Sequence, residues 1–141
     1  MYRFTPRFQA GLEYNPAASE VNPLFNWTLN PESDKLPMIN LGMSSDRIGT
    51  PPGPMSYYVT FAKSFPLHKV GCYVSLSYSE FERGFTIPFG ASYHFTPEWS
   101  TMFMHDGRRS HLLLTHAQAD WSVSLMWIWF KHPGISFSFG F

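Results

Sequence analysis

Apolar and polar residues alternate along most of the chain, and a period of two predicts β-strands. The clearest example is the end of the chain, where Ile135, Phe137, Phe139 and Phe141 alternate with small polar residues. Similar alternation, weakest over 100–105 and 111–118, predicts strands over residues 8–15, 21–30, 39–44, 57–62, 70–79, 85–95, 100–105, 111–118, 121–130 and 135–141.

Proline, glycine and aspartate lie between these segments at regular intervals and predict tight turns. Examples are Asn15-Pro16, Thr96-Pro97 and Asp106-Gly107, and the last turn is expected over 131–134. The sequence therefore predicts one all-β domain, an antiparallel up-and-down sheet of about ten strands. Pro88 lies inside a predicted strand, where its missing N–H predicts a bulge or kink.

Alternation alone leaves two folds open, because a soluble barrel or sandwich hides its apolar face whereas a membrane barrel exposes it to lipid. Composition favours the membrane barrel. Only 14% of residues are charged, against about 25% in soluble domains. The polar positions of the strands carry mainly Ser, Gly, Thr and Asn, which suit the crowded interior of a narrow barrel. Aromatic residues also gather near both ends of the strands, as in the girdles of outer-membrane barrels.

The final strand resembles the C-terminal strand by which outer-membrane proteins are recognised for assembly. The residues that carry the resemblance are a terminal Phe141 and apolar residues at alternate positions before it, Ile135, Phe137 and Phe139. The resemblance implies a bacterial outer-membrane β-barrel, porin-like in architecture. It also implies contact with outer-membrane lipid, with lipopolysaccharide and with the barrel-assembly machinery.

A second resemblance covers residues 39–63, which are similar to barrel segments of YjbH-like exopolysaccharide-associated proteins. It rests on Leu41-Gly42, Asp46, Ile48-Gly49-Thr50, Tyr58 and Lys63. No specific function follows from it.

Two polar clusters are the candidate sites, and the strand order places both at the extracellular rim. Their residues are Asp46, Arg47, Asp106, Arg108, Arg109 and His111. They either form solvated loops and salt-bridge networks, or line a charged constriction that selects solutes, or bind lipopolysaccharide phosphates through Arg108 and Arg109.

Catalysis and metal binding have little support in the sequence. Asp46, Asp106, Ser110 and His111 offer the groups of a rim hydrolase, but adjacent Ser110 and His111 point to opposite faces of a strand. The histidines are scattered, Cys72 is the only cysteine, and the net charge is zero without a basic stripe. We therefore expect no enzyme, no cofactor, no metal and no nucleic-acid partner.

Three functions remain open at this stage: a narrow channel, a structural or anchoring subunit of an envelope assembly with a plugged lumen, and a rim enzyme that modifies lipid. Residues 1–4 continue the alternation and meet a turn at Thr5-Pro6, and no apolar leader is visible. We therefore expect further strands upstream, with this chain as the C-terminal part of a larger barrel.

Overall fold

The structure, a computed structural model, describes residues 1–15, 20–46 and 51–139 and is all-β. The fold class predicted from alternation is confirmed as an antiparallel, up-and-down sheet. Its strands are β1 (Tyr2–Thr5), β2 (Phe8–Asn15), β3 (Glu20–Asn30), β4 (Met38–Ser45), β5 (Met55–Phe65), β6 (Val70–Ser79), β7 (Gly84–Thr86), β8 (Phe89–His94), β9 (Trp99–His105), β10 (Ser110–Ala117), β11 (Trp121–Ile128) and β12 (His132–Phe139).

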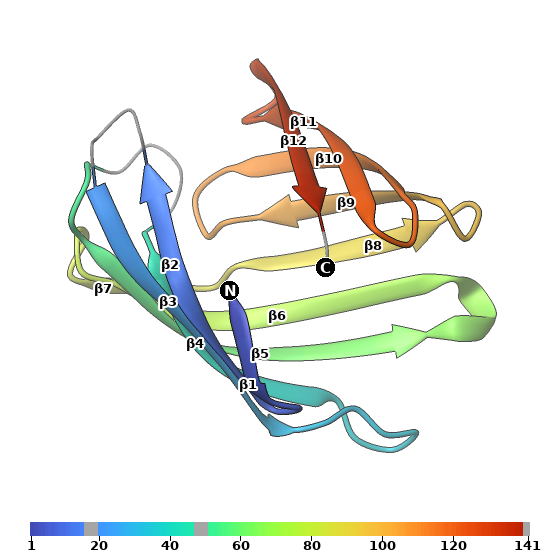
Figure 1. The fold of residues 1–141 in the computed structure, drawn as a ribbon, viewed down its shortest axis with the longest axis horizontal. Coiled ribbons are helices and arrows are strands. Elements are labelled where there is room, and N and C mark those ends of the chain that lie inside the picture. Colours follow the sequence, from blue (N-terminus) through green and yellow to red (C-terminus); the bar gives the residue numbers. More distant parts are fainter. Residues whose placement is uncertain (16–19, 47–50, 140–141) are drawn as a thin grey trace. The chain divides into compact units, whose positions relative to one another are not determined.

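The strands pair in the order β1-β2-β3-β4-β5-β6-β8-β9-β10-β11-β12, and β7 also pairs with β6 (Figure 1). The connection between β5 and β6 holds a short 3-10 turn, Pro66–His68. The described residues contain no helix long and apolar enough to cross a membrane.

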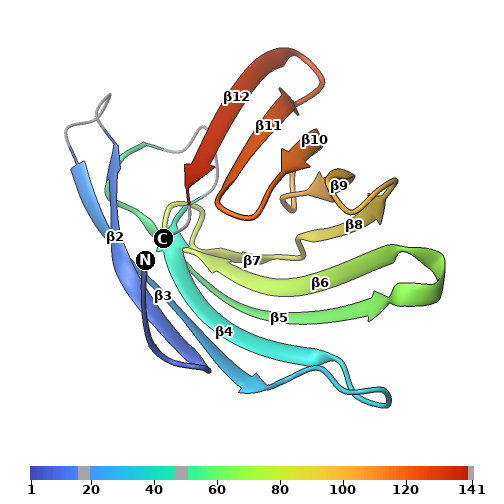
Figure 2. The same cartoon turned by 45° about the vertical axis from the view of Figure 1, so that its right-hand side comes forward.

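The segment predicted as one strand over 85–95 is divided into β7 and β8, and Ile87 and Pro88 lie between them (Figure 2). Proline has no N–H to donate to a ladder, so the interruption falls where the sequence predicts an irregularity.

The predicted position of the last turn is wrong. Residues 132–134 belong to β12, and the turn lies at Trp129 and Phe130, which both take positive φ, 56° and 54°. The amide of Lys131 closes the turn by donating to the carbonyl of Ile128 at 3.0 Å. The sequence predicts Pro133 as a turn residue, but it lies on β12, the last strand in the pairing order, where a missing N–H is tolerated.

The chain divides into two compact units. Unit 1 contains Met1–Lys63 and Val74–Ile87, and unit 2 contains Ser64–Tyr73 and Pro88–Phe141. In unit 1, β2 to β5 run side by side as consecutive antiparallel neighbours. In unit 2, β8 to β12 do the same.

Burial is inverted relative to a soluble protein. Along β6, Val74 and Leu76 are 44% and 50% exposed, whereas Ser75 and Ser77 are each 7% exposed. Met55, at 9%, is the one buried apolar side chain among the described residues. Along β6 the apolar face is therefore the exposed face, as predicted, and the small polar residues form the covered face, whereas on β12 Ser136 and Ser138 are exposed as well as Phe137.

Candidate functional site

The β9–β10 loop in unit 2 is organised by a carboxylate. One oxygen of Asp106 accepts the backbone N–H groups of Arg108 and Arg109 at 2.8 and 2.7 Å. The amide of Asp106 donates to the carbonyl of Arg109 at 2.9 Å, and Gly107 supplies the positive φ of 95° that the tight loop needs. Aspartate commonly closes such turns with its own side chain.

The other oxygen of Asp106 lies 3.0 Å from Nε2 of His111, which is only 4% exposed. Partial burial by itself raises the pKa of Asp106. Hydrogen bonds from the Arg109 amide, the His111 ring and the Arg108 amide outweigh it, so the pKa lies below its ordinary value. The Asp106 carboxylate therefore stabilises the loop through hydrogen bonds within it.

Arg109 reaches from this loop to the β11–β12 turn. Its guanidinium carbon lies 4.0 Å from the centroid of the Trp129 ring, which is a cation–π contact. The His132 ring packs edge-on against the same indole, with centroids 5.7 Å apart. The two neighbouring rings, Trp127 and Phe130, pack against each other at 5.5 Å and remain half exposed.

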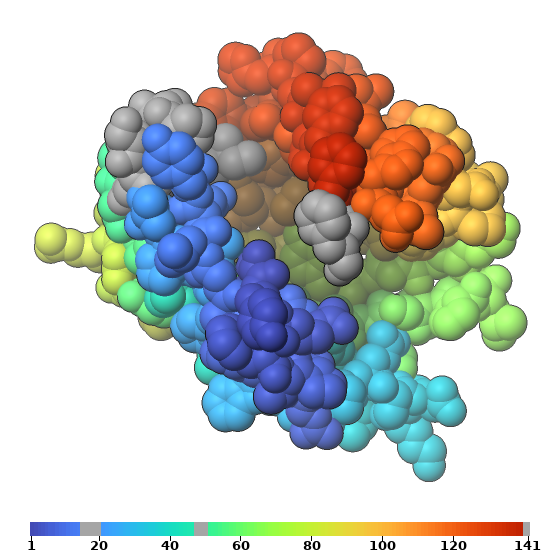
Figure 3. All heavy atoms as spheres, viewed as in Figure 1, coloured from blue at the N-terminus to red at the C-terminus, as the bar shows by residue number. Residues whose placement is uncertain are grey.

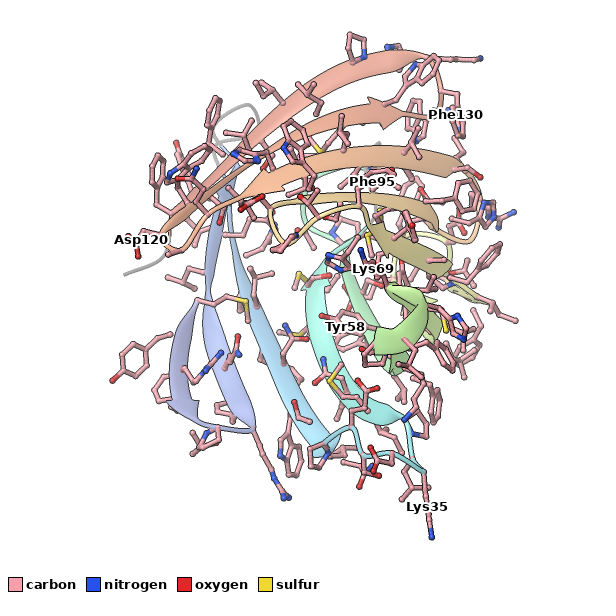
Figure 4. The ribbon with its side chains drawn as sticks, turned by 90° about the vertical axis from the view of Figure 1, so that its right-hand side faces the viewer. Lys35, Tyr58, Lys69, Phe95, Asp120 and Phe130 are labelled. Carbon is pink, nitrogen blue, oxygen red and sulfur yellow. The ribbon has the colours of Figure 1, made fainter. Side chains whose placement is uncertain are left out.

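We define the Arg109–Trp129 cluster as Arg109 together with four residues of the β11–β12 hairpin, Trp127, Trp129, Phe130 and His132. It lies at the Phe130 end of β11, and Asp120 marks the opposite end of that strand (Figure 4). Arg108 and Arg109 are both predicted site residues, but the contact of Arg109 with Trp129 is not predicted, because the alternation places Trp129 inside a strand.

A serine–histidine pair lies where β9 and β10 meet this loop. His105 Nδ1 lies 3.0 Å from Ser110 Oγ, and the two residues are direct cross-strand partners. The histidine that meets Ser110 is thus a different one from the histidine that meets Asp106. The structure shows two separate pairs rather than a Ser–His–Asp relay.

Asp46, the first predicted site residue, lies in unit 1 and accepts a hydrogen bond from the Ser79 hydroxyl. Near it, Glu80 accepts the Met55 amide at 2.9 Å and the Tyr57 hydroxyl at 2.8 Å. The Met55 amide, and then Tyr57, lower the pKa of Glu80. Arg47 lies outside the described residues. Because Asp46 and Asp106 belong to different units, their placement at a common rim stays a prediction.

A network of polar side chains lies on the covered face of unit 1, where the sequence predicts the residue types but not their pairs. Ser56 and Ser77 hydroxyls lie 2.7 Å apart, as do those of Thr60 and Ser75. Asn26 Oδ1 accepts from Tyr58 at 2.8 Å and from Asn40 at 2.9 Å. These groups satisfy one another.

Two tyrosine rings fill the space above glycines. A Cβ on Gly42 would lie 2.4 Å from the Tyr58 ring, and in unit 2 a Cβ on Gly90 would lie 2.6 Å from Tyr73. An aromatic ring lying over a strand glycine covers backbone that would otherwise be bare.

The predicted assembly residues lie on β12, whose atoms stand on the surface (Figure 3). Ile135, Phe137 and Phe139 are 57%, 62% and 70% exposed and lie opposite Leu125, Val123 and Trp121. Phe141 lies outside the described residues.

Unit 2 carries one further polar feature, a shallow cleft of about 310 Å³ near the β5–β6 connection. Its polar lining includes Ser64, Lys69, Ser92 and His94. No signal in the sequence joined these residues, which come together through the backbone bond from His94 N–H to the Lys69 carbonyl, 2.9 Å long.

No protein-family model matches the chain, and neither a characterised protein nor a solved structure matches it.

Proposed function

We propose that this chain is a bacterial outer-membrane β-barrel protein with a structural or anchoring role in the envelope. The observation that carries the proposal is the inverted burial along β6, where Ser75 and Ser77 are covered while Val74 and Leu76 are exposed. A sheet in water buries its apolar face. A sheet in lipid does the reverse, since hydrocarbon covers the apolar side chains.

The same reasoning applies to the exposed apolar side chains of the other strands. Burying apolar area contributes about 25 cal/mol per Å², and among the described residues Met55 is the one buried apolar side chain, while Leu12, Phe85 and Phe139 remain 72%, 70% and 70% exposed. A hydrocarbon environment would cover the aromatic and aliphatic side chains that remain exposed. Lipid also demands that every backbone group be paired. The proposal therefore includes closure of the sheet, with β1 pairing to β12 or to further strands.

A structural role is favoured over a channel by the way the polar face is filled. Its hydroxyls bond to each other rather than standing free, as the Ser56–Ser77 and Thr60–Ser75 pairs show. The Tyr58 ring occupies the space above Gly42. A conducting pore needs water along the polar face, and hydroxyls that bond to each other and a tyrosine ring packed over Gly42 leave less room for it.

Cys72 provides a direct test of the lipid-facing face. It is the only cysteine in the sequence, it is exposed, and it lies two positions before Val74 on the same face of β6. In phosphatidylcholine vesicles, with a polar maleimide present on both sides of the bilayer, we expect Cys72 to stay unreacted until detergent and urea release the chain.

The matched control is the double variant Cys72→Ser/Leu67→Cys. Leu67 is 96% exposed in the β5–β6 connection, outside the strands, so its thiol should react in intact vesicles. Equal reaction rates at positions 72 and 67 in vesicles would refute the membrane location. Steady ion conductance of the reconstituted protein in planar bilayers would refute the structural role in favour of a channel.

A further inference from the structure

We propose that the Arg109–Trp129 cluster binds the phosphate of an anionic lipid headgroup, an inference that rests on the proposed membrane location. The site brings together a cation, a flat aromatic ring and exposed apolar side chains at the end of the β11–β12 hairpin. Each of these has a definite part in recognising a lipid at the membrane surface.

The charge of Arg109 is available. The nearest acid in its loop, Asp106, uses one oxygen for two backbone amides and the other for His111. Within the part of the chain that the structure describes, the Arg109 guanidinium has no carboxylate partner. An exposed cation held in place without a counter-charge is a site for an external anion.

Trp129 sets the orientation of that cation. A guanidinium held over an aromatic face can still offer its N–H donors to another partner. Those donors form a fork that matches two oxygens of a phosphate. The His132 ring also packs edge-on against this indole, with centroids 5.7 Å apart.

The apolar part of the cluster points to a lipid rather than a free anion. Trp127 and Phe130 are 51% and 43% exposed and pack together at the same turn. Aromatic side chains beside cations are characteristic of the headgroup level of a bilayer. The turn also holds Trp129 and Phe130 in the left-handed region, which asparagine and glycine occupy at lower cost, so the aromatic residues are kept there against local backbone preference.

The test uses the full chain in detergent micelles and phosphatidylglycerol with brominated acyl chains as the probe. Binding is read as quenching of tryptophan fluorescence, and brominated phosphatidylcholine is the uncharged comparison. We expect the wild-type protein to favour phosphatidylglycerol. Arg109→Ala should lower the affinity for phosphatidylglycerol about fivefold, which is the effect of one cation near an anionic surface. The affinity of Arg109→Lys should fall between those of the wild type and Arg109→Ala.

The control is Lys35→Ala, which removes one exposed cation from the loop between β3 and β4 and keeps every tryptophan. It should bind phosphatidylglycerol as the wild type does. Equal loss in Lys35→Ala and Arg109→Ala would overturn the proposal, as would an Arg109→Ala variant that binds normally. Complete displacement of the lipid by inorganic phosphate would assign the site to the free anion instead and overturn it too.

The two proposals fail separately. Protection of Cys72 in phosphatidylcholine vesicles reports the membrane location and involves no anionic lipid. If Cys72 is protected and Arg109→Ala binds normally, the headgroup site alone is refuted. If Cys72 reacts freely, the membrane location itself is refuted, whatever the lipid assay shows.

Discussion

Replacing Gly42 with alanine should destabilise the protein through the Tyr58 ring. The added Cβ would lie 2.4 Å from Cζ and 2.5 Å from the hydroxyl oxygen of Tyr58. Ordinary contact begins near 3.4 Å, so the ring must move by about 1 Å. That movement breaks the hydrogen bond from Tyr58 to Asn26, which is 2.8 Å long.

The expected cost combines two effects. Overpacking a covered site costs about 1–3 kcal/mol, and losing one hydrogen bond costs about 1 kcal/mol. Gly42→Ala should therefore lower the free energy of unfolding by about 2–4 kcal/mol. Urea unfolding of the protein in micelles, followed by tryptophan fluorescence, measures the change if the slope of the transition stays constant.

Gly84→Ala is the matched control, because a Cβ there meets its nearest atom at an ordinary 3.7 Å. It should change stability by less than about 0.5 kcal/mol. The cost of Gly42→Ala should also largely vanish in a Tyr58→Ala background, since the ring that it displaces is gone. If Gly42→Ala and Gly84→Ala differ by less than about 0.5 kcal/mol, or if the cost persists without the ring, the packing argument is wrong.

Two further predictions concern the connections. Asp106 has a lowered pKa in the folded state, so the stability that it contributes is present above its ordinary pKa of 3.8 and is lost as pH falls through the lower folded pKa. The urea midpoint of the wild type should therefore fall more steeply below about pH 4 than that of Asp106→Asn. Parallel pH profiles of the two proteins would contradict this. Lys69 has a φ of 54° after the 3-10 turn, so Lys69→Val should be about 1–2 kcal/mol less stable than Lys69→Gly. Leu67→Val, at a fully exposed neighbour, should change little, and an equal effect at both positions would exclude backbone strain as the cause.

The fold was predictable because its signal is local. A strand places alternate side chains on opposite faces, so the residues of β6 or β12 can be assigned to two faces from their order alone. Turn residues such as Asp106-Gly107 act through their own backbone preferences and were found where predicted. The last turn was misplaced because Pro133 and Gly134 carry the strongest local turn signal, while the pairing of β11 with β12 placed the turn at Trp129 and Phe130 instead.

The candidate site was only partly predictable for a related reason. The charged residues Asp106, Arg108 and Arg109 stand out in a sequence with so few charges, and they lie within four consecutive positions. The partner of Arg109 is twenty positions away, and only the register between β10 and β11 brings Trp129 beside it. The histidine that meets Ser110 is likewise chosen by cross-strand register rather than by adjacency.

By itself, the sequence determined the strand content, the two faces of each strand and the small polar character of one of them, since each follows from periodicity within a few residues. The tertiary structure alone decided which hydroxyls pair, which ring covers Gly42 and which ring carries Arg109. Those contacts join residues from different strands, and a shift of register by one position would replace every one of them. Their partners are set by the hydrogen-bonded alignment of whole strands, which no local pattern encodes.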